Sequence, residues 1–211
     1  MMKTIFLFLI FTGVNSFAQW SSATIKLGSF GPSATEAGFI IGYEGGKSID
    51  EIFNFGWSLD WFHKSYVDKD LVEDFNNVYG ISGGLNELRA ETNLHDFPLM
   101  INVTGRQNVA PRTDVFISGS VGAEVLIIDY NNFENPDESE LQGAYDFNWR
   151  IGVGGLYQLS QRADLLLEFS YHSSKPSWEY EVDDPVIGKR TFERVFDMSG
   201  LMARLGFRFY Y

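Results

Sequence analysis

The chain has 211 residues, no cysteine and a formal net charge of −12. The lack of cysteine excludes a disulfide scaffold, a zinc–thiolate site and a thiol nucleophile. An acidic chain with no basic run lacks the cations that displace counterions from phosphate, which excludes nucleic acid as a partner. No shift in composition divides the chain, so one folded domain is expected.

The N-terminus predicts an export signal. An apolar run from Ile5 to Phe11 follows Lys3 and leads into small residues at the end of the segment. This order is typical of a secretory signal peptide, so we expect residues 1–18 to be cleaved and residues 19–211 to form the mature domain. The run is shorter than the about 20 residues that a membrane helix needs, and no later stretch qualifies. If the mature chain enters a membrane, it must therefore do so as strands.

Alternation of apolar and polar residues predicts eight strands after the signal. Successive side chains of a strand point to opposite faces, and each segment has one apolar face. The segments also approach the about 9 to 11 residues with which a tilted strand crosses a bilayer. The predicted strands cover residues 23–30, 37–45, 53–62, 93–104, 113–130, 144–159, 163–173 and 201–211.

The last of these strands carries the clearest signal and the third the next clearest, whereas the fourth contains a proline. In the third, large apolar residues alternate with polar or small ones from Phe53 to Trp61. Pro98 interrupts the fourth and is a mild argument against it, because proline cannot donate to a strand ladder. The last reads LMARLGFRFYY and places Arg204 and Arg208 opposite its apolar face. A soluble barrel would bury the apolar faces; with charges on the other face, the pattern favours a membrane barrel, whose apolar faces point outward.

The connections between the predicted strands differ in length by position. Long polar segments lie at residues 64–92, 131–143 and 174–190, whereas the connections after the second, fourth and sixth strands are shorter. In a meander, alternate connections emerge at the same end. This layout predicts an eight-stranded antiparallel up-and-down transmembrane β-barrel with long extracellular loops and both termini in the periplasm.

Charged residues on the inward faces are the main candidate functional set. Four cations and four carboxylates are expected to pair inside the barrel, with glycines leaving room for the long side chains. They either line a narrow polar path or plug the lumen, and a barrel of eight strands favours the plug. The expected lumen charge network consists of Lys26, Glu44, Asp60, Glu124, Arg150, Glu168, Arg204 and Arg208.

The three histidines suggest a rim site less strongly. His63 and His95 share the parity of the lipid-facing residues, whereas His172 points inward, so the three are not expected to converge. His172 with Ser170 or Ser173 and Asp96 would supply a base, a nucleophile and a carboxylate. Serine and aspartate are abundant here, however, and such a trio arises by chance. We therefore predict no catalytic, cofactor-binding or metal-ligating residue.

An acidic segment within residues 131–143 is a candidate for collecting divalent cations. It lacks the spacing and the central glycine of a calcium-binding EF-hand loop. A solvated loop is the preferred interpretation of these residues, which are Glu134, Asp137, Glu138 and Glu140.

The closing LMARLGFRFYY is similar to the C-terminal signal by which the outer-membrane assembly machinery recognises barrels, with Phe207, Phe209 and Tyr211 as its aromatic positions. The mature chain resembles the small outer-membrane barrel families of the OmpX, OmpW and OmpA-transmembrane type. The resemblance implies contact with outer-membrane lipid, lipopolysaccharide and that machinery. It implies a role in surface interaction, adhesion or envelope integrity through the loops. Passage of small solutes and an enzyme at the extracellular rim are the alternatives.

Overall fold

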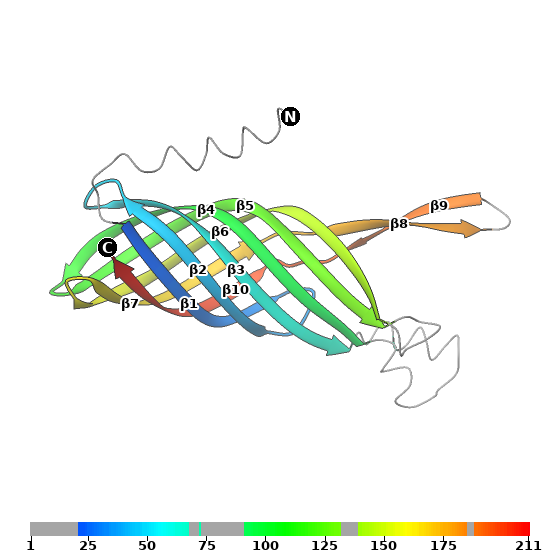
Figure 1. The fold of residues 1–211 in the computed structure, drawn as a ribbon, viewed down its shortest axis with the longest axis horizontal. Helices are drawn as coiled ribbons and strands as arrows, with labels where there is room; N and C mark the ends of the chain where they lie inside the picture. Colours follow the sequence, from blue (N-terminus) through cyan, green and yellow to red (C-terminus); the bar gives the residue numbers. More distant parts are fainter. Residues whose placement is uncertain (1–20, 68–71, 73–90, 132–138, 185–187) are drawn as a thin grey trace.

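The structure is a computed structural model that describes residues 21–67, 72, 91–131, 139–184 and 188–211. Ten antiparallel strands make up nearly all of these residues (Figure 1). The strands are β1 (Ser21–Pro32), β2 (Gly38–Ser48), β3 (Phe53–Val67), β4 (Glu91–Ala110), β5 (Thr113–Asn131), β6 (Ser139–Ser160), β7 (Ala163–Ser173), β8 (Ser177–Asp184), β9 (Gly188–Val195) and β10 (Gly200–Tyr210).

Eight of the strands close into a barrel. Their order is β5-β4-β3-β2-β1-β10-β7-β6, and a further pairing of β5 with β6 joins the two ends of the sheet. Closure pairs the backbone groups of each barrel strand on both sides, which is the condition for strands to cross hydrocarbon. Strands β8 and β9 form a hairpin that projects beyond the barrel (Figure 1). The predicted eight-stranded up-and-down transmembrane barrel is confirmed.

The outer face of the barrel is apolar. Along β10 and its neighbours, alternate large side chains point away from the barrel, with exposed fractions of 58% for Leu205 and 53% for Phe169. The intervening side chains are buried inside, including Arg204 and Arg208. Such a surface is stable against lipid and would be unstable against water. Within the described part of the chain, no helix is long and apolar enough to cross a membrane.

The segment at residues 174–190 was expected to be a loop, and this prediction is wrong. Most of it belongs to the β8–β9 hairpin, whose register runs from Ser177 opposite Val195 to Asp184 opposite Gly188. Strands β8 and β9 pair with each other, and only one position of β8 pairs with the barrel. The connection expected at residues 105–112 is also shorter than predicted, because β4 continues to Ala110.

Pro98 lies within β4 and interrupts only one of its two ladders. The β3–β4 register contains no pair for Asp60 or Trp61, the two positions facing Pro98 and Phe97. The β4–β5 register is continuous there, with Pro98 opposite Glu124. Proline lacks the N–H of one ladder bond, and the intact second ladder keeps the strand in place.

Replacing Leu205 with arginine tests whether the outer face contacts lipid. Leu205 lies in the middle of β10, opposite Leu27 and Leu167. We expect Leu205→Arg to lower the free energy of unfolding in lipid vesicles by about 2–4 kcal/mol, because the charge enters hydrocarbon. Gln107→Arg, near the short turn after β4, should change it by less than about 0.5 kcal/mol. Equal effects in a denaturant titration would contradict a lipid-covered face.

Candidate functional site

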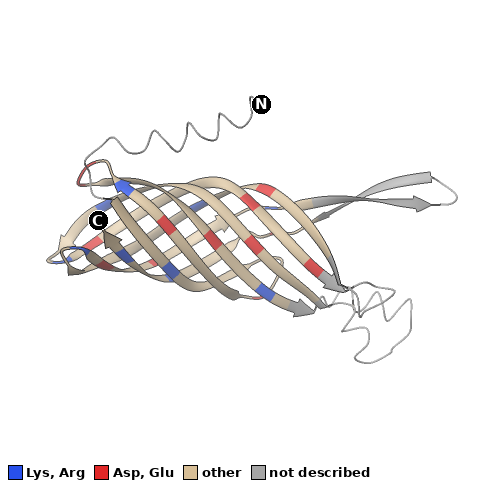
Figure 2. Cartoon of the chain, in the orientation of Figure 1, with Lys and Arg blue, Asp and Glu red and all other residues tan. Residues whose placement is uncertain are grey.

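Acidic and basic residues recur along the barrel strands (Figure 2). Those whose side chains point inward form a network of buried ion pairs. Lys26 on β1 links two of its carboxylates. The Lys26 Nζ atom lies 2.6 Å from Oε2 of Glu44 and 2.7 Å from Oε2 of Glu168. Glu44 also accepts from Nη2 of Arg208 at 3.1 Å, and Nε of Arg208 donates to Thr24 Oγ1 at 3.1 Å. One lysine therefore joins carboxylates that are far apart in the sequence.

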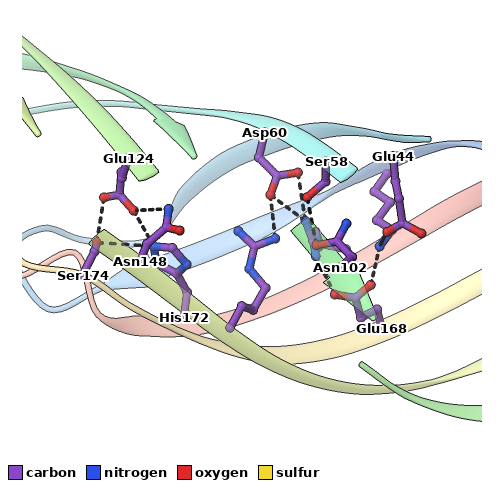
Figure 3. Close-up of polar contacts among 12 residues, drawn as sticks. Glu44, Ser58, Asp60, Asn102, Glu124, Asn148, Glu168, His172 and Ser174 are labelled. Atoms are coloured by element: carbon purple, nitrogen blue, oxygen red, sulfur yellow. Dashed lines mark hydrogen bonds and ion pairs between the residues drawn. The ribbon is translucent and has the colours of Figure 1, made fainter. Parts of the chain in front are cut away.

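Arg204 on β10 extends the network across the lumen. Its Nη2 lies 2.5 Å from Oε1 of Glu168, and its Nη1 lies 3.1 Å from Oδ1 of Asp60. Asp60 also accepts from Nη1 of Arg150 at 2.6 Å (Figure 3). Gly42 makes the contact sterically feasible, because a Cβ atom there would clash with Oδ1 of Asp60. Burial makes each ion depend on its partners, since the surroundings offer little water.

The structure brings seven of the eight expected charged residues into this network. They are Lys26, Glu44, Asp60, Arg150, Glu168, Arg204 and Arg208.

Among the residues that the structure describes, no arginine or lysine pairs with Glu124, so its expected place in the charge network needs correction. Its Oε2 lies 2.6 Å from Nε2 of His172 and accepts from Nδ2 of Asn148 at 3.3 Å. Its Oε1 accepts from Oγ of Ser174 at 2.7 Å (Figure 3). Pairing residues by formal charge alone did not identify His172, Asn148 and Ser174 as partners, although His172 and Asn148 share the inward parity of Glu124.

The residues around His172 do not form a nucleophile–base–carboxylate relay. Ser174 Oγ lies 3.4 Å from His172 Nε2, but Glu124 contacts the same ring nitrogen. In a hydrolytic triad the carboxylate holds the opposite nitrogen, and no described residue hydrogen-bonds to His172 Nδ1. The Asp96 carboxyl oxygens have no donor among the described residues, and Ser173 Oγ contacts Ser199 Oγ instead. His172 is also fully buried, so the cluster cannot meet a substrate in this conformation.

An apolar layer fills the interior toward the end of the barrel that carries the long connections. We call it the outer apolar layer. Phe196 and Met198 enter it from the connection between β9 and β10. Phe30 of the same layer contacts the His172 ring edge-on, with ring centroids 5.6 Å apart. The members of the layer are Phe30, Ile40, Phe62, Leu94, Leu126, Ile128, Ala144, Phe196, Met198 and Met202. A smaller inner apolar cluster, formed by Phe116, Leu156 and Leu166, lies toward the end with the short turns.

His63 and His95 meet on the outside of the barrel. They face each other across β3 and β4, and their rings stack with centroids 4.5 Å apart. Trp61 Nε1 donates to His95 Nδ1 at 3.3 Å. The alternation of faces correctly placed both histidines on the opposite face from His172. That they are direct neighbours follows only from the pairing register of β3 with β4. The described residues contain no group of three or more ligand side chains arranged for a metal ion.

Two other expected sets have different outcomes. The acidic segment of Glu134, Asp137 and Glu138 lies outside the described residues, as does the side chain of Glu140. The aromatic side chains at the end of the last strand point outward and are exposed, namely those of Phe207, Phe209 and Tyr211.

The β8–β9 hairpin is tied to the barrel at its base. Backbone N–H groups of Phe196 and Met198 donate to the carbonyls of Pro176 at 2.9 Å and Ser174 at 3.1 Å. Ser174 in turn holds Glu124 inside the barrel. Beyond this base, β8 pairs with the barrel through a single position of β6. The base of the hairpin is therefore fixed to the barrel. Among the described residues, the rest of β8 and β9 pair only with each other.

Solved barrels of bacterial outer membranes share this architecture. No protein-family model and no curated protein matches the chain. OprG from Pseudomonas aeruginosa aligns with a TM-score of 0.60 and 10% identity, over 92% of this chain and 96% of OprG. A major outer membrane protein from Thermus thermophilus aligns at 0.62 and 12%, over 92% and 100% of the two chains. Neisserial surface protein A aligns at 0.56 and 9%, over 90% and 95%.

The chain has the small outer-membrane β-barrel fold. In such barrels the long connections are extracellular and the short turns face the periplasm. In this chain the β8–β9 hairpin and the outer apolar layer lie at the end with the long connections, which we therefore expect to be extracellular. The start of β1 and the end of β10 lie at the opposite end, where backbone N–H groups of Ser21 and Tyr211 donate to each other's carbonyls.

Proposed function

We propose that the protein is a surface-interaction protein of the outer membrane, in which a plugged barrel serves as the anchor for an extracellular binding hairpin. The observation that carries this proposal is the β8–β9 hairpin, which projects from the barrel (Figure 1). The interior favours an anchor over a pore, because ion pairs and apolar layers fill it. A rigid scaffold that presents an exposed segment is a common basis of binding.

The proposed ligand is an extended segment of an extracellular protein. Apart from Ser177 opposite Tyr145, the described strands give β8 no partner other than β9. Unpaired strand edges offer N–H and C=O groups to an added strand, and this β-augmentation is a common mode of peptide recognition. The fixed base of the hairpin lowers the entropy that binding must overcome.

Shortening the hairpin tests this function. In one variant the dipeptide Asn-Gly replaces residues 178–194, which leaves the pair of Ser177 and Val195 closed by a two-residue turn. Cells that display the full chain should adhere to immobilised extracellular proteins that contain extended segments, and the shortened variant should lose most of this adhesion. Lys64→Ala, which removes a partly exposed rim ion pair, is the matched control and should adhere like the full chain. Equal adhesion of the full and shortened chains would refute the proposal.

Export and assembly complete the proposal. Residues 1–18 serve as the cleaved signal, and the exposed aromatic side chains of Phe207, Phe209 and Tyr211 are read by the barrel assembly machinery. The apolar outer face then contacts outer-membrane lipid, with lipopolysaccharide around the extracellular end. A solute pore and a rim enzyme receive less support, because the lumen is filled and the His172 cluster is buried.

A further inference from the structure

The periplasmic end of the barrel contains a polar cavity of about 810 Å³, which we call the periplasmic cup. This volume lies in the range of sites for small ligands. The turn between β2 and β3 forms one wall, and the ends of β4 to β7 form the others. The inner apolar cluster closes the cup above Leu156, so the cup is a dead end rather than a channel entrance.

Hydrogen bonds fix the wall formed by the turn between β2 and β3. Oδ1 of Asp50 accepts from the backbone N–H groups of Phe53 at 2.6 Å and Ile52 at 2.8 Å. These hydrogen bonds lower the pKa of the Asp50 carboxyl group below its usual value. Arg106 on β4 donates its backbone N–H to Ile52 O at 2.9 Å and its Nε to Glu51 O at 3.0 Å. The turn is therefore held across the barrel mouth before any ligand arrives.

Most acidic groups of the cup already accept hydrogen bonds inside it. Tyr210 donates to Oδ2 of Asp164 at 2.7 Å and accepts from Nη1 of Arg106 at 3.4 Å. Asn108 donates to Oδ1 of Asp114 at 2.8 Å. These contacts build the floor and one corner of the cup, and among the described residues none of these carboxylates pairs with Arg112.

The wall facing that turn carries unpaired hydrogen-bonding groups. Arg112 has a φ of 63°, an uncommon conformation for a residue with a side chain. The backbone N–H of Gln158 donates to the Arg112 carbonyl at 2.8 Å and holds this conformation. Among the described residues, nothing hydrogen-bonds to the Arg112 guanidinium or to the side-chain amides of Gln158 and Gln161, and all three residues line the cup. Pro111 and Arg112 form the tight turn between β4 and β5, and a positive φ at its second residue is common turn geometry that sets the direction of the Arg112 side chain.

We propose that the periplasmic cup binds a peptide that ends in a free carboxylate, the chemical class that includes the stem peptides of the bacterial cell wall. The Arg112 guanidinium matches a carboxylate with two parallel hydrogen bonds. The two glutamine amides each offer a donor and an acceptor to the peptide groups that precede it. The cup faces the periplasm, where such peptides occur. Binding there would link the barrel to the layer beneath the outer membrane.

Calorimetry of the full mature chain in detergent micelles tests the proposal with soluble muropeptides as the probe. Arg112→Gly removes the guanidinium, and glycine suits the positive φ, so this variant should fold. We expect Arg112→Gly to raise Kd by at least about tenfold, which is the loss of a charge-assisted pair. Muropeptides with amidated carboxylates should bind the unaltered chain with a similarly raised Kd.

Arg162→Ala is the matched control, because it removes the same charge at the next periplasmic turn without touching the lining of the cup. Its Kd should equal that of the unaltered chain. Absence of muropeptide binding would overturn the proposal, as would an Arg112→Gly variant that binds normally. An equal loss in Arg162→Ala would also overturn it, because the attraction would then depend on overall charge. Amidated peptides that bind as tightly as free ones would show that the carboxylate is not recognised.

Discussion

Replacing Arg204 with methionine is expected to lower the free energy of unfolding by about 3–5 kcal/mol. Arg204 contacts both Asp60 and Glu168, and all three side chains are no more than 2% exposed. Methionine fills a similar volume but leaves the carboxylates facing each other with less positive charge. Denaturant titration in lipid vesicles, with linear extrapolation to water, measures the loss.

A second substitution separates lost pairing from lost packing. Adding Glu168→Gln to Arg204→Met removes one of the uncompensated charges, so the double variant should be more stable than the sum of the two single losses predicts. Lys64→Ala provides the surface comparison, since the Lys64–Glu36 pair is partly exposed and should contribute less than about 1 kcal/mol. If the losses at Arg204 and Glu168 simply add, the network does not act as a unit.

Replacing Phe62 with alanine is expected to cost about 3–5 kcal/mol, the usual loss for a fully buried phenylalanine. Phe62 is completely buried in the outer apolar layer, and its ring meets that of Phe30 edge-on at 5.1 Å. Gly38 packs so closely that a Cβ atom there would lie 2.7 Å from the Phe62 ring. The cavity left by Phe62→Ala therefore has little chance to collapse. Phe39→Ala, on the lipid-facing side of β2, should cost clearly less because Phe39 is 52% exposed.

The Phe62→Ala variant also tests whether the filled lumen blocks the passage of ions. In planar bilayers the unaltered chain should show no stable single-channel current, and Phe62→Ala should show none either. The reason is that Arg150, Asp60 and Arg204 still bridge the lumen beneath the outer apolar layer. Sizeable, stable currents from the unaltered chain would contradict a plugged barrel and would favour passage of solutes.

Much of the barrel follows from the sequence because lipid selects one face of every strand. The period of two identified the outward side chains, such as Phe207 and Phe209, and the inward ones, such as Arg204 and Arg208. The number of barrel strands followed from the same period, since each strand must cross the bilayer. Alternation also recognised β4 despite Pro98, whose effect is confined to the ladder with β3.

The expectations about partners were less complete. Parity placed Glu124 inside the barrel, but an inward carboxylate has several possible neighbours, and the register with tilted strands decides among them. His172, Asn148 and Ser174 reach Glu124, whereas the arginines reach Asp60, Glu44 and Glu168. The hairpin segment was expected to be a loop because it is charged, but charge does not distinguish a solvated loop from a pair of strands that lies outside the barrel.

By itself, the sequence determined which side chains face lipid and which face the lumen, because strand geometry and hydrocarbon impose a rule on every second residue. Only the tertiary structure decided which side chains meet, because closure of the barrel sets the stagger between strands. That stagger stacked His63 on His95 and brought Arg204 between Asp60 and Glu168. It also gathered Arg112, Gln158 and Gln161 around one periplasmic cup.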